Sequence, residues 1–127
     1  MHTNSPRPAR FAAVLSILTL CAGPALAHKP SLQECREAGE FVRNAALARD
    51  AGMRRDDFLG RLEGDLVAIR GYPPALRWFA QDADDEAFLI AAVEVVFDSP
   101  MRSSEHESET LRKCLARMDP AFTLLGR

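Results

Sequence analysis

Several kinds of motif are missing from this chain, and each absence removes a class of function. Only three cysteines are present, and none are spaced as Cys-x-x-Cys, so thiol exchange, covalent haem attachment and close-spaced zinc sites lack their usual motif. The motifs Ser-x-x-Lys, Gly-x-Ser-x-Gly and His-Glu-x-x-His are also missing. Basic residues are in deficit, with 16 Lys and Arg against 18 Asp and Glu, which disfavours nucleic-acid binding. We therefore expect no enzymatic activity, no cofactor and no nucleic-acid partner.

One long apolar run is present, and it lies at the amino terminus. The mostly apolar segment Phe11 to Ala22 follows two arginines and precedes Ala25-Leu26-Ala27, which has a small-x-small pattern. This order is typical of a secretory signal peptide that is cleaved before His28. The sequence therefore predicts a signal peptide over residues 1–27 and one helical domain over 28–127, located in the periplasm or secreted.

Two further features bear on how the exported chain is held in the envelope. Lipidation of Cys21 is an alternative to its removal, although Leu20 stands where lipoprotein signals carry a small residue. After Ala27 no apolar run approaches the ~20 residues of a membrane span, so we expect no span after cleavage. We also expect a frayed amino terminus at His28, as is usual for chain ends.

The two cysteines that remain after cleavage, Cys35 and Cys114, lie near the ends of the predicted domain. An even number of cysteines in an oxidising compartment favours a disulfide over two free thiols. Each cysteine also falls on the apolar face of a predicted helix. We therefore expect a Cys35–Cys114 disulfide that joins the first helix to the last.

Apolar residues recur with helical spacing through the mature chain and predict an all-α bundle of four to five helices. Ser31 with Glu34, and Ser104 with Glu107, have the spacing of capping boxes, and Asp82 is a suitable N-cap. Gly52 and Pro100 mark helix ends. The predicted helices cover residues 32–51, 55–70, a short segment 74–79, 83–97 and 104–118.

Charged residues on the predicted helices suggest one internal ion pair. Arg49 falls within the apolar face of the first helix, and a buried guanidinium usually needs a carboxylate. Glu94 and Asp98 are four residues apart on the least apolar side of the fourth predicted helix, and Asp57 is a further candidate. We predict that Arg49 pairs with one of these carboxylates.

Two classes of function stay open. The first is a non-enzymatic accessory protein that binds another envelope protein, with Tyr72, Trp78, Phe79 and Phe122 as the possible contact surface, because aromatic side chains often anchor interfaces. The alternative is a carrier of a small ligand or metal that uses Glu94, Asp98 and His106, with His106 expected on a polar, exposed face. The sequence specifies neither the partner nor the oligomeric state.

The chain also resembles short exported bacterial helical proteins of unknown function. The similarity rests on the signal-like segment, Cys35, Cys114 and two helix ends, Ala48-Arg49-Asp50-Ala51-Gly52 and Phe97-Asp98-Ser99-Pro100. The resemblance implies no activity and no catalytic residues. It does imply a periplasmic location in a Gram-negative cell.

Overall fold

The structure is a computed structural model, and it describes residues 28–118. Over these residues the chain forms α-helices and one short 3-10 turn, with no strand, as the sequence predicts. The signal-like segment, Cys21 and Phe122 lie outside the described residues. The elements are α1 (Leu32–Asp50), α2 (Arg55–Ile69), η1 (Pro74–Leu76), α3 (Ala83–Asp98) and α4 (Ser103–Met118).

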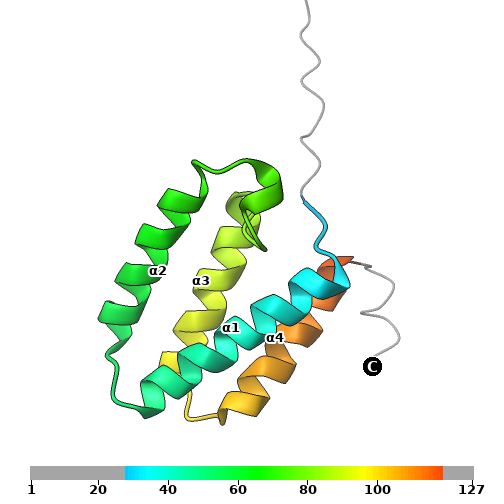
Figure 1. The fold of residues 1–127 in the computed structure, drawn as a ribbon. Coiled ribbons are helices and arrows are strands. Elements are labelled where there is room, and N and C mark those ends of the chain that lie inside the picture. Colours follow the sequence, from blue (N-terminus) through cyan, green and yellow to red (C-terminus); the bar gives the residue numbers. More distant parts are fainter. Residues whose placement is uncertain (1–27, 119–127) are drawn as a thin grey trace, which may run out of the picture.

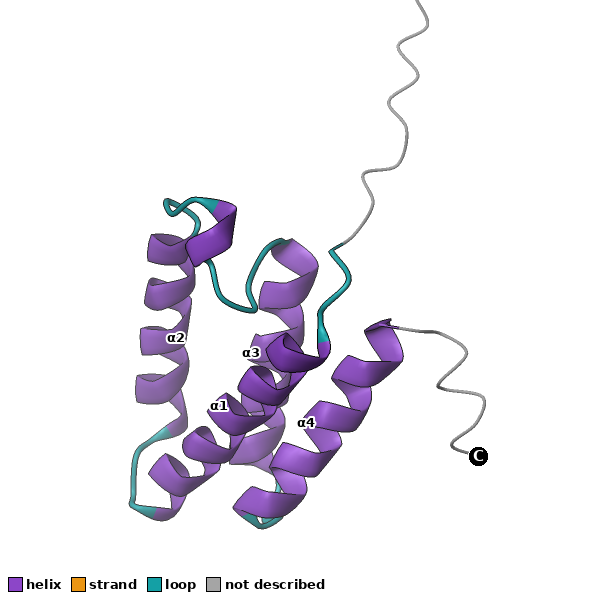
Figure 2. Ribbon diagram, turned by 45° about the vertical axis from the view of Figure 1, so that its right-hand side comes forward, coloured by secondary structure: helices purple, strands orange, loops and turns teal. Residues whose placement is uncertain are grey.

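The helices form a bundle in which α3 lies between α2 and the closely packed pair of α1 and α4 (Figures 1 and 2). Helix α1 contacts both α4 and α3, and α2 contacts α3. Each helix contributes one apolar stripe to a single core. The fully or nearly fully buried apolar side chains are Cys35, Ala38, Val42, Ala45, Ala46, Leu59, Leu62, Leu66, Phe79, Ala80, Leu89, Val93, Val96 and Cys114.

The α1–α4 contact is held by the predicted disulfide between Cys35 and Cys114, whose Cα atoms are 5.5 Å apart. The two helices also approach closely at Gly39. A Cβ atom at this position would lie 3.3 Å from the carbonyl oxygen of Glu107. The glycine therefore permits a helix spacing that a larger residue would widen, and the disulfide fixes the same interface one turn earlier.

Helix ends follow the sequence signals closely at two of three predicted caps. Ser31 and Glu34 form a complete capping box, and the Asp82 side chain accepts a hydrogen bond from the Asp85 N–H. The expected capping box at Ser104 is wrong. Helix α4 begins at Ser103, and the Glu105 carboxylate accepts the Arg102 N–H, so the chain enters the helix one residue earlier than predicted.

The connection from α2 to α3 is a tight turn rather than a helix reaching Phe79. After η1, Trp78 adopts a φ of 54°, a left-handed conformation that is rare for a bulky side chain. The Gln81 side chain donates to the carbonyl oxygens of Pro74 (2.9 Å) and Trp78 (2.7 Å). This amide holds the strained turn and directs Phe79 into the core, where it is fully buried.

Within residues 28–118, no helix combines the length and the apolar character needed to cross a membrane.

Candidate functional site

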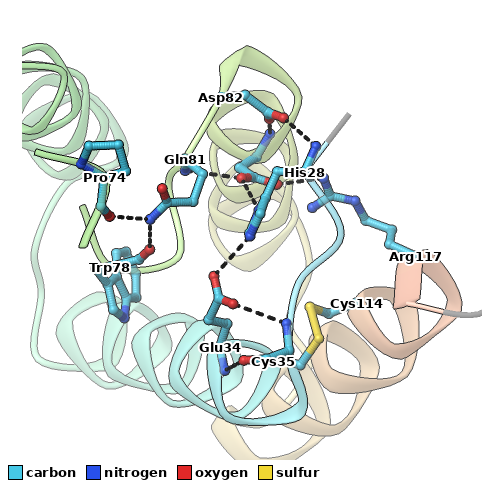
Figure 3. Close-up of polar contacts among 11 residues, drawn as sticks. His28, Glu34, Cys35, Pro74, Trp78, Gln81, Asp82, Cys114 and Arg117 are labelled. Atoms are coloured by element: carbon cyan, nitrogen blue, oxygen red, sulfur yellow. Dashed lines mark hydrogen bonds and ion pairs between the residues drawn. A yellow bond between two sulfur atoms is a disulfide. The ribbon is translucent and has the colours of Figure 1, made fainter. Parts of the chain in front are cut away.

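Around the carboxylate of Asp85, the start of α3 meets the end of α4 and the chain that leads into α1. Figure 3 shows Asp82, Arg117 and His28 at this corner of the bundle. Asp85 lies in the first turn of α3 and is fully buried. Its Oδ1 is 2.6 Å from Nη2 of Arg117, near the end of α4. Its Oδ2 accepts the Gln81 N–H at 3.0 Å and lies 2.8 Å from Nδ1 of His28. The buried charge is thus compensated by one permanent cation and two further polar contacts, as a buried carboxylate requires.

Residues 28–30 form a short strap that leads from this corner into α1. The backbone nitrogen of His28 donates to Oδ2 of Asp82 at 2.8 Å, and Nε2 of its ring lies 3.4 Å from the Glu34 carboxylate. Figure 3 shows the imidazole between the acids of α3 and Glu34 of α1. The expectation of a frayed end at His28 is therefore wrong, because this residue contacts two helices through both its backbone and its ring.

Asp82 is the N-cap of α3, and its environment favours the charged form. Burial opposes ionisation, but hydrogen bonds from the backbone N–H groups of Asp85 and His28 outweigh it and lower the pKa of Asp82. The nearby charge of Arg117 acts in the same direction. Asp82 therefore remains an anion that faces the strap.

Arg117, the cationic partner of Asp85, lies over two aromatic rings. The guanidinium carbon lies 5.0 Å from the ring centre of Phe88 and 5.7 Å from that of Phe79. Within the part of the chain that is described, its Nη1 atom is buried without a hydrogen-bond partner. Attraction between the cation and the aromatic faces offsets part of that cost.

A separate cavity of about 120 Å³ lies between α3 and α4. Its walls are mainly apolar, and Glu109 and Lys113 stand 3.7 Å apart on α4 among the lining residues. A shallower hollow shares Val95, Glu109 and Lys113 with the cavity and continues along α4 past Ser108. The cavity is lined by Phe88, Ala91, Ala92, Val95, His106, Glu109, Thr110 and Lys113.

His106 forms part of the cavity wall and is 2% exposed, so the predicted exposed position is wrong. Burial lowers the pKa of His106, and the positive charge of Arg49 lowers it further. Arg49 Nη1 lies 3.3 Å from His106 Nε2. Because a guanidinium can only donate, this contact favours the neutral tautomer of His106 in which Nε2 is free to accept.

The predicted ion pair of Arg49 with Glu94, Asp98 or Asp57 is not formed. Arg49 instead donates to the carbonyl oxygens of Val96 (2.6 Å), Ser99 (2.8 Å) and Met101 (2.9 Å), and its carboxylate partner is the adjacent Asp50. The last carbonyls of a helix have no partner inside the helix, and a cation also complements the negative end of the helix dipole. Arg49 therefore caps the carboxyl end of α3.

The other residues proposed for a carrier site do not come together. Asp98 pairs with Arg55 of α2 at 3.2 Å, whereas His106 faces Arg49 and the α3/α4 cavity. Glu94 lies in the second half of α3 and is half-buried. Over residues 28–118, no cluster of three His, Cys, Asp or Glu side chains is arranged to hold a metal ion.

The aromatic residues proposed as a contact surface separate into different environments. Phe79 is fully buried, so it belongs to the core and not to a surface. Trp78 is partly buried, with its ring 5.4 Å from that of Phe41 and 6.0 Å from that of Phe79. Tyr72 remains exposed, as does Leu76. Only Tyr72 of the described aromatic candidates is therefore freely available to a partner.

Helical spacing in the sequence indicates the burial of three polar residues of these two sites. His106 and Thr110 precede Cys114 by eight and four residues, which places all three on the buried stripe of α4. Asp85 likewise precedes Leu89 and Val93 by four and eight residues on α3. Helical spacing from a residue already placed in the core indicates burial even where the residue itself is polar.

The chain matches no protein-family model, no curated protein and no solved structure.

Proposed function

We propose that this chain is an exported, non-enzymatic binding protein of the cell envelope. The signal-like segment 1–27 supports export, and the Cys35–Cys114 disulfide is the form expected of two thiols in an oxidising compartment. The buried ionisable groups of the two sites described above are engaged in structural contacts rather than in a nucleophile and base pair. Binding is the function that these features favour.

The observation that carries the proposal is the α3/α4 cavity. A volume of about 120 Å³ is slightly below that of an engineered apolar cavity that admits benzene, about 150 Å³. It suits a branched aliphatic side chain such as leucine better than a large aromatic one. The adjoining hollow extends the same groove along α4, with charges of both signs at its edge. The proposed ligand is therefore a protein segment that inserts one aliphatic side chain.

Site-specific photocrosslinking tests this proposal in the intact envelope. A photoreactive residue replaces Val95, which lines the groove and is 41% exposed, and the matched control replaces Val67, which is 61% exposed on α2. We expect a discrete crosslinked protein from position 95 and none from position 67. Adding Ala91→Leu, which fills the mouth of the cavity, should remove the crosslink. Equal crosslinking from both positions, no crosslink from 95, or a product that survives Ala91→Leu contradicts the proposal.

Carriage of a small apolar molecule is the second candidate, and the partial enclosure of the same cavity favours it. A molecule that binds only the folded state raises the melting temperature by mass action. Purified protein is heated with and without benzene or indole, and the Ala91→Leu variant serves as the control. A rise in the melting temperature of the wild-type protein that is absent from the variant supports carriage. An unchanged melting temperature of the wild-type protein excludes ligands of this class.

A further inference from the structure

The corner around Asp85 has an unequal charge balance in the uncleaved chain. Three carboxylates, those of Glu34, Asp82 and Asp85, surround the His28 strap. Among residues 28–118, Arg117 is the one permanent cation in direct contact with these acids. The His28 backbone nitrogen already lies 2.8 Å from Asp82 Oδ2. While residue 27 is attached, that nitrogen is a neutral amide with a single proton to donate.

We infer that cleavage between Ala27 and His28 creates an α-ammonium group that this corner binds, and that the site is complete only in the processed protein. Hydrolysis of the Ala27–His28 peptide bond consumes one water, leaves a carboxylate on Ala27 and gives the His28 nitrogen a positive charge with three donors. This inference rests on the proposed export. The acids of α3 then form the binding site for the new amino terminus.

The strap is held in place by contacts that do not depend on cleavage. Pro30 is buried, Ser31 caps α1, and Cys35 in the following turn is bonded to Cys114 of α4. Arg117 is three residues beyond Cys114, so the disulfide places the start of α1 beside the end of α4 and beside the first turn of α3. The disulfide and the expected cleavage site therefore lie at the same corner of the bundle.

The ammonium stabilises the folded state through charge as well as hydrogen bonding. Its nitrogen contacts Asp82, while the imidazole of the same residue contacts Asp85 of α3 and Glu34 of α1, and Arg117 of α4 contacts Asp85. The positive end of the α3 dipole and the charge of Arg117 both repel a cation at this position. The negative charge of the three carboxylates exceeds these two repulsive contributions. An α-amine has a pKa near 7.7–8.0 when unfolded. Neighbouring carboxylates raise the pKa of this amine, so its stabilisation is present below that range and is lost as the pH rises through the folded value.

The test compares two forms of the oxidised protein. One begins at His28, and the other retains Ala25-Leu26-Ala27, so that its His28 nitrogen is an amide. At pH 7 we expect the extended form to melt roughly 4–8 °C lower, a shift typical of one lost interaction in a domain of this size. The difference should shrink at pH 10, because the α-amine loses its proton as the pH rises above its unfolded range. Equal melting temperatures at pH 7, or a difference that is unchanged at pH 10, overturn the inference.

A matched pair of variants separates the ammonium contact from a general effect of extra residues. Asp82→Asn preserves a good N-cap for α3 but removes the charge, and it should abolish the difference between the two forms. Asp84→Asn, in the same turn and exposed, should preserve it. A difference that persists in Asp82→Asn contradicts the inference. Amino-terminal sequencing of exported protein tests the cleavage position separately, so a failure of the export proposal is distinguishable from a failure of terminus binding.

Discussion

The guanidinium of Arg49 lies 2.6 Å from the carbonyl oxygen of Val96, although 47 residues separate them in the sequence. This contact joins the end of α1 to the end of α3. Together with the bonds to Ser99 and Met101, it ties the segment that follows α3 to the end of α1. Replacing Arg49 with Met should therefore be costly, because three carbonyl groups lose a charged donor.

We expect Arg49→Met to lower the free energy of unfolding by roughly 2–4 kcal/mol. Arg49→Lys should recover only part of that loss, since an ammonium lacks the planar fork that reaches three carbonyls. Urea denaturation of the oxidised proteins measures both changes. A loss below about 0.5 kcal/mol, typical of a surface change, would show that Arg49 does not cap α3 in solution.

The buried, neutral His106 should make stability depend on pH. Its pKa is lowered in the folded state, so the unfolded chain binds more protons as the pH falls below about 6.5. Stability should therefore decrease between pH 7 and pH 5. His106→Gln should flatten this dependence, and melting curves at the two pH values measure it. An identical slope in wild type and variant would refute the assignment to His106.

The Cys35–Cys114 disulfide should supply a large share of the stability of the domain. Its sequence separation of 79 corresponds to about 4.5 kcal/mol of chain entropy removed from the unfolded state. The double variant Cys35→Ala/Cys114→Ala is expected to lose about that amount in urea denaturation. A loss of less than about 1 kcal/mol would mean that the cross-link constrains the unfolded chain far less than this loop length implies.

Replacing glycine with alanine should raise or lower the stability of the domain, depending on the position of the glycine. A Cβ atom at Gly60 or Gly64 meets no atom within 4 Å, so alanine there should stabilise α2 by about 0.5–1 kcal/mol. Gly39→Ala should gain less or destabilise, because its Cβ approaches the Glu107 carbonyl oxygen. Thermal melts of the three variants give the comparison. Stabilisation by Gly39→Ala equal to that by Gly60→Ala would show that the α1–α4 contact is looser than described.

Local patterns predicted the helices well because their signals lie within a few residues. Ser31 and Glu34 identify the start of α1, and Gly52, with a φ of 97°, follows its end. The capping prediction at Ser104 was wrong because Glu105 offered a competing acceptor for the Arg102 N–H. Arg102 with Glu105 and Ser104 with Glu107 have the same spacing two residues apart, and the sequence alone does not rank them.

The contacts of the candidate sites were harder to predict because several of the partners are backbone groups. Arg49 binds carbonyl oxygens that any residue supplies, so no side chain marks them in the sequence. The corner around Asp85 depends on the first turn of α3, the end of α4 and a strap before α1. Only the packing of the whole bundle brings these together, although the spacing of Asp85 from Leu89 already indicated an inward position.

Export with processing before His28 is the claim on which the proposed function and the bound terminus both depend. Mass spectrometry of the protein recovered from the cell envelope, with amino-terminal sequencing and thiol labelling, tests it directly. The account predicts a chain that begins at His28 and has no reactive thiol at Cys35 or Cys114. A chain that retains Met1, or two free thiols in the folded protein, would contradict it.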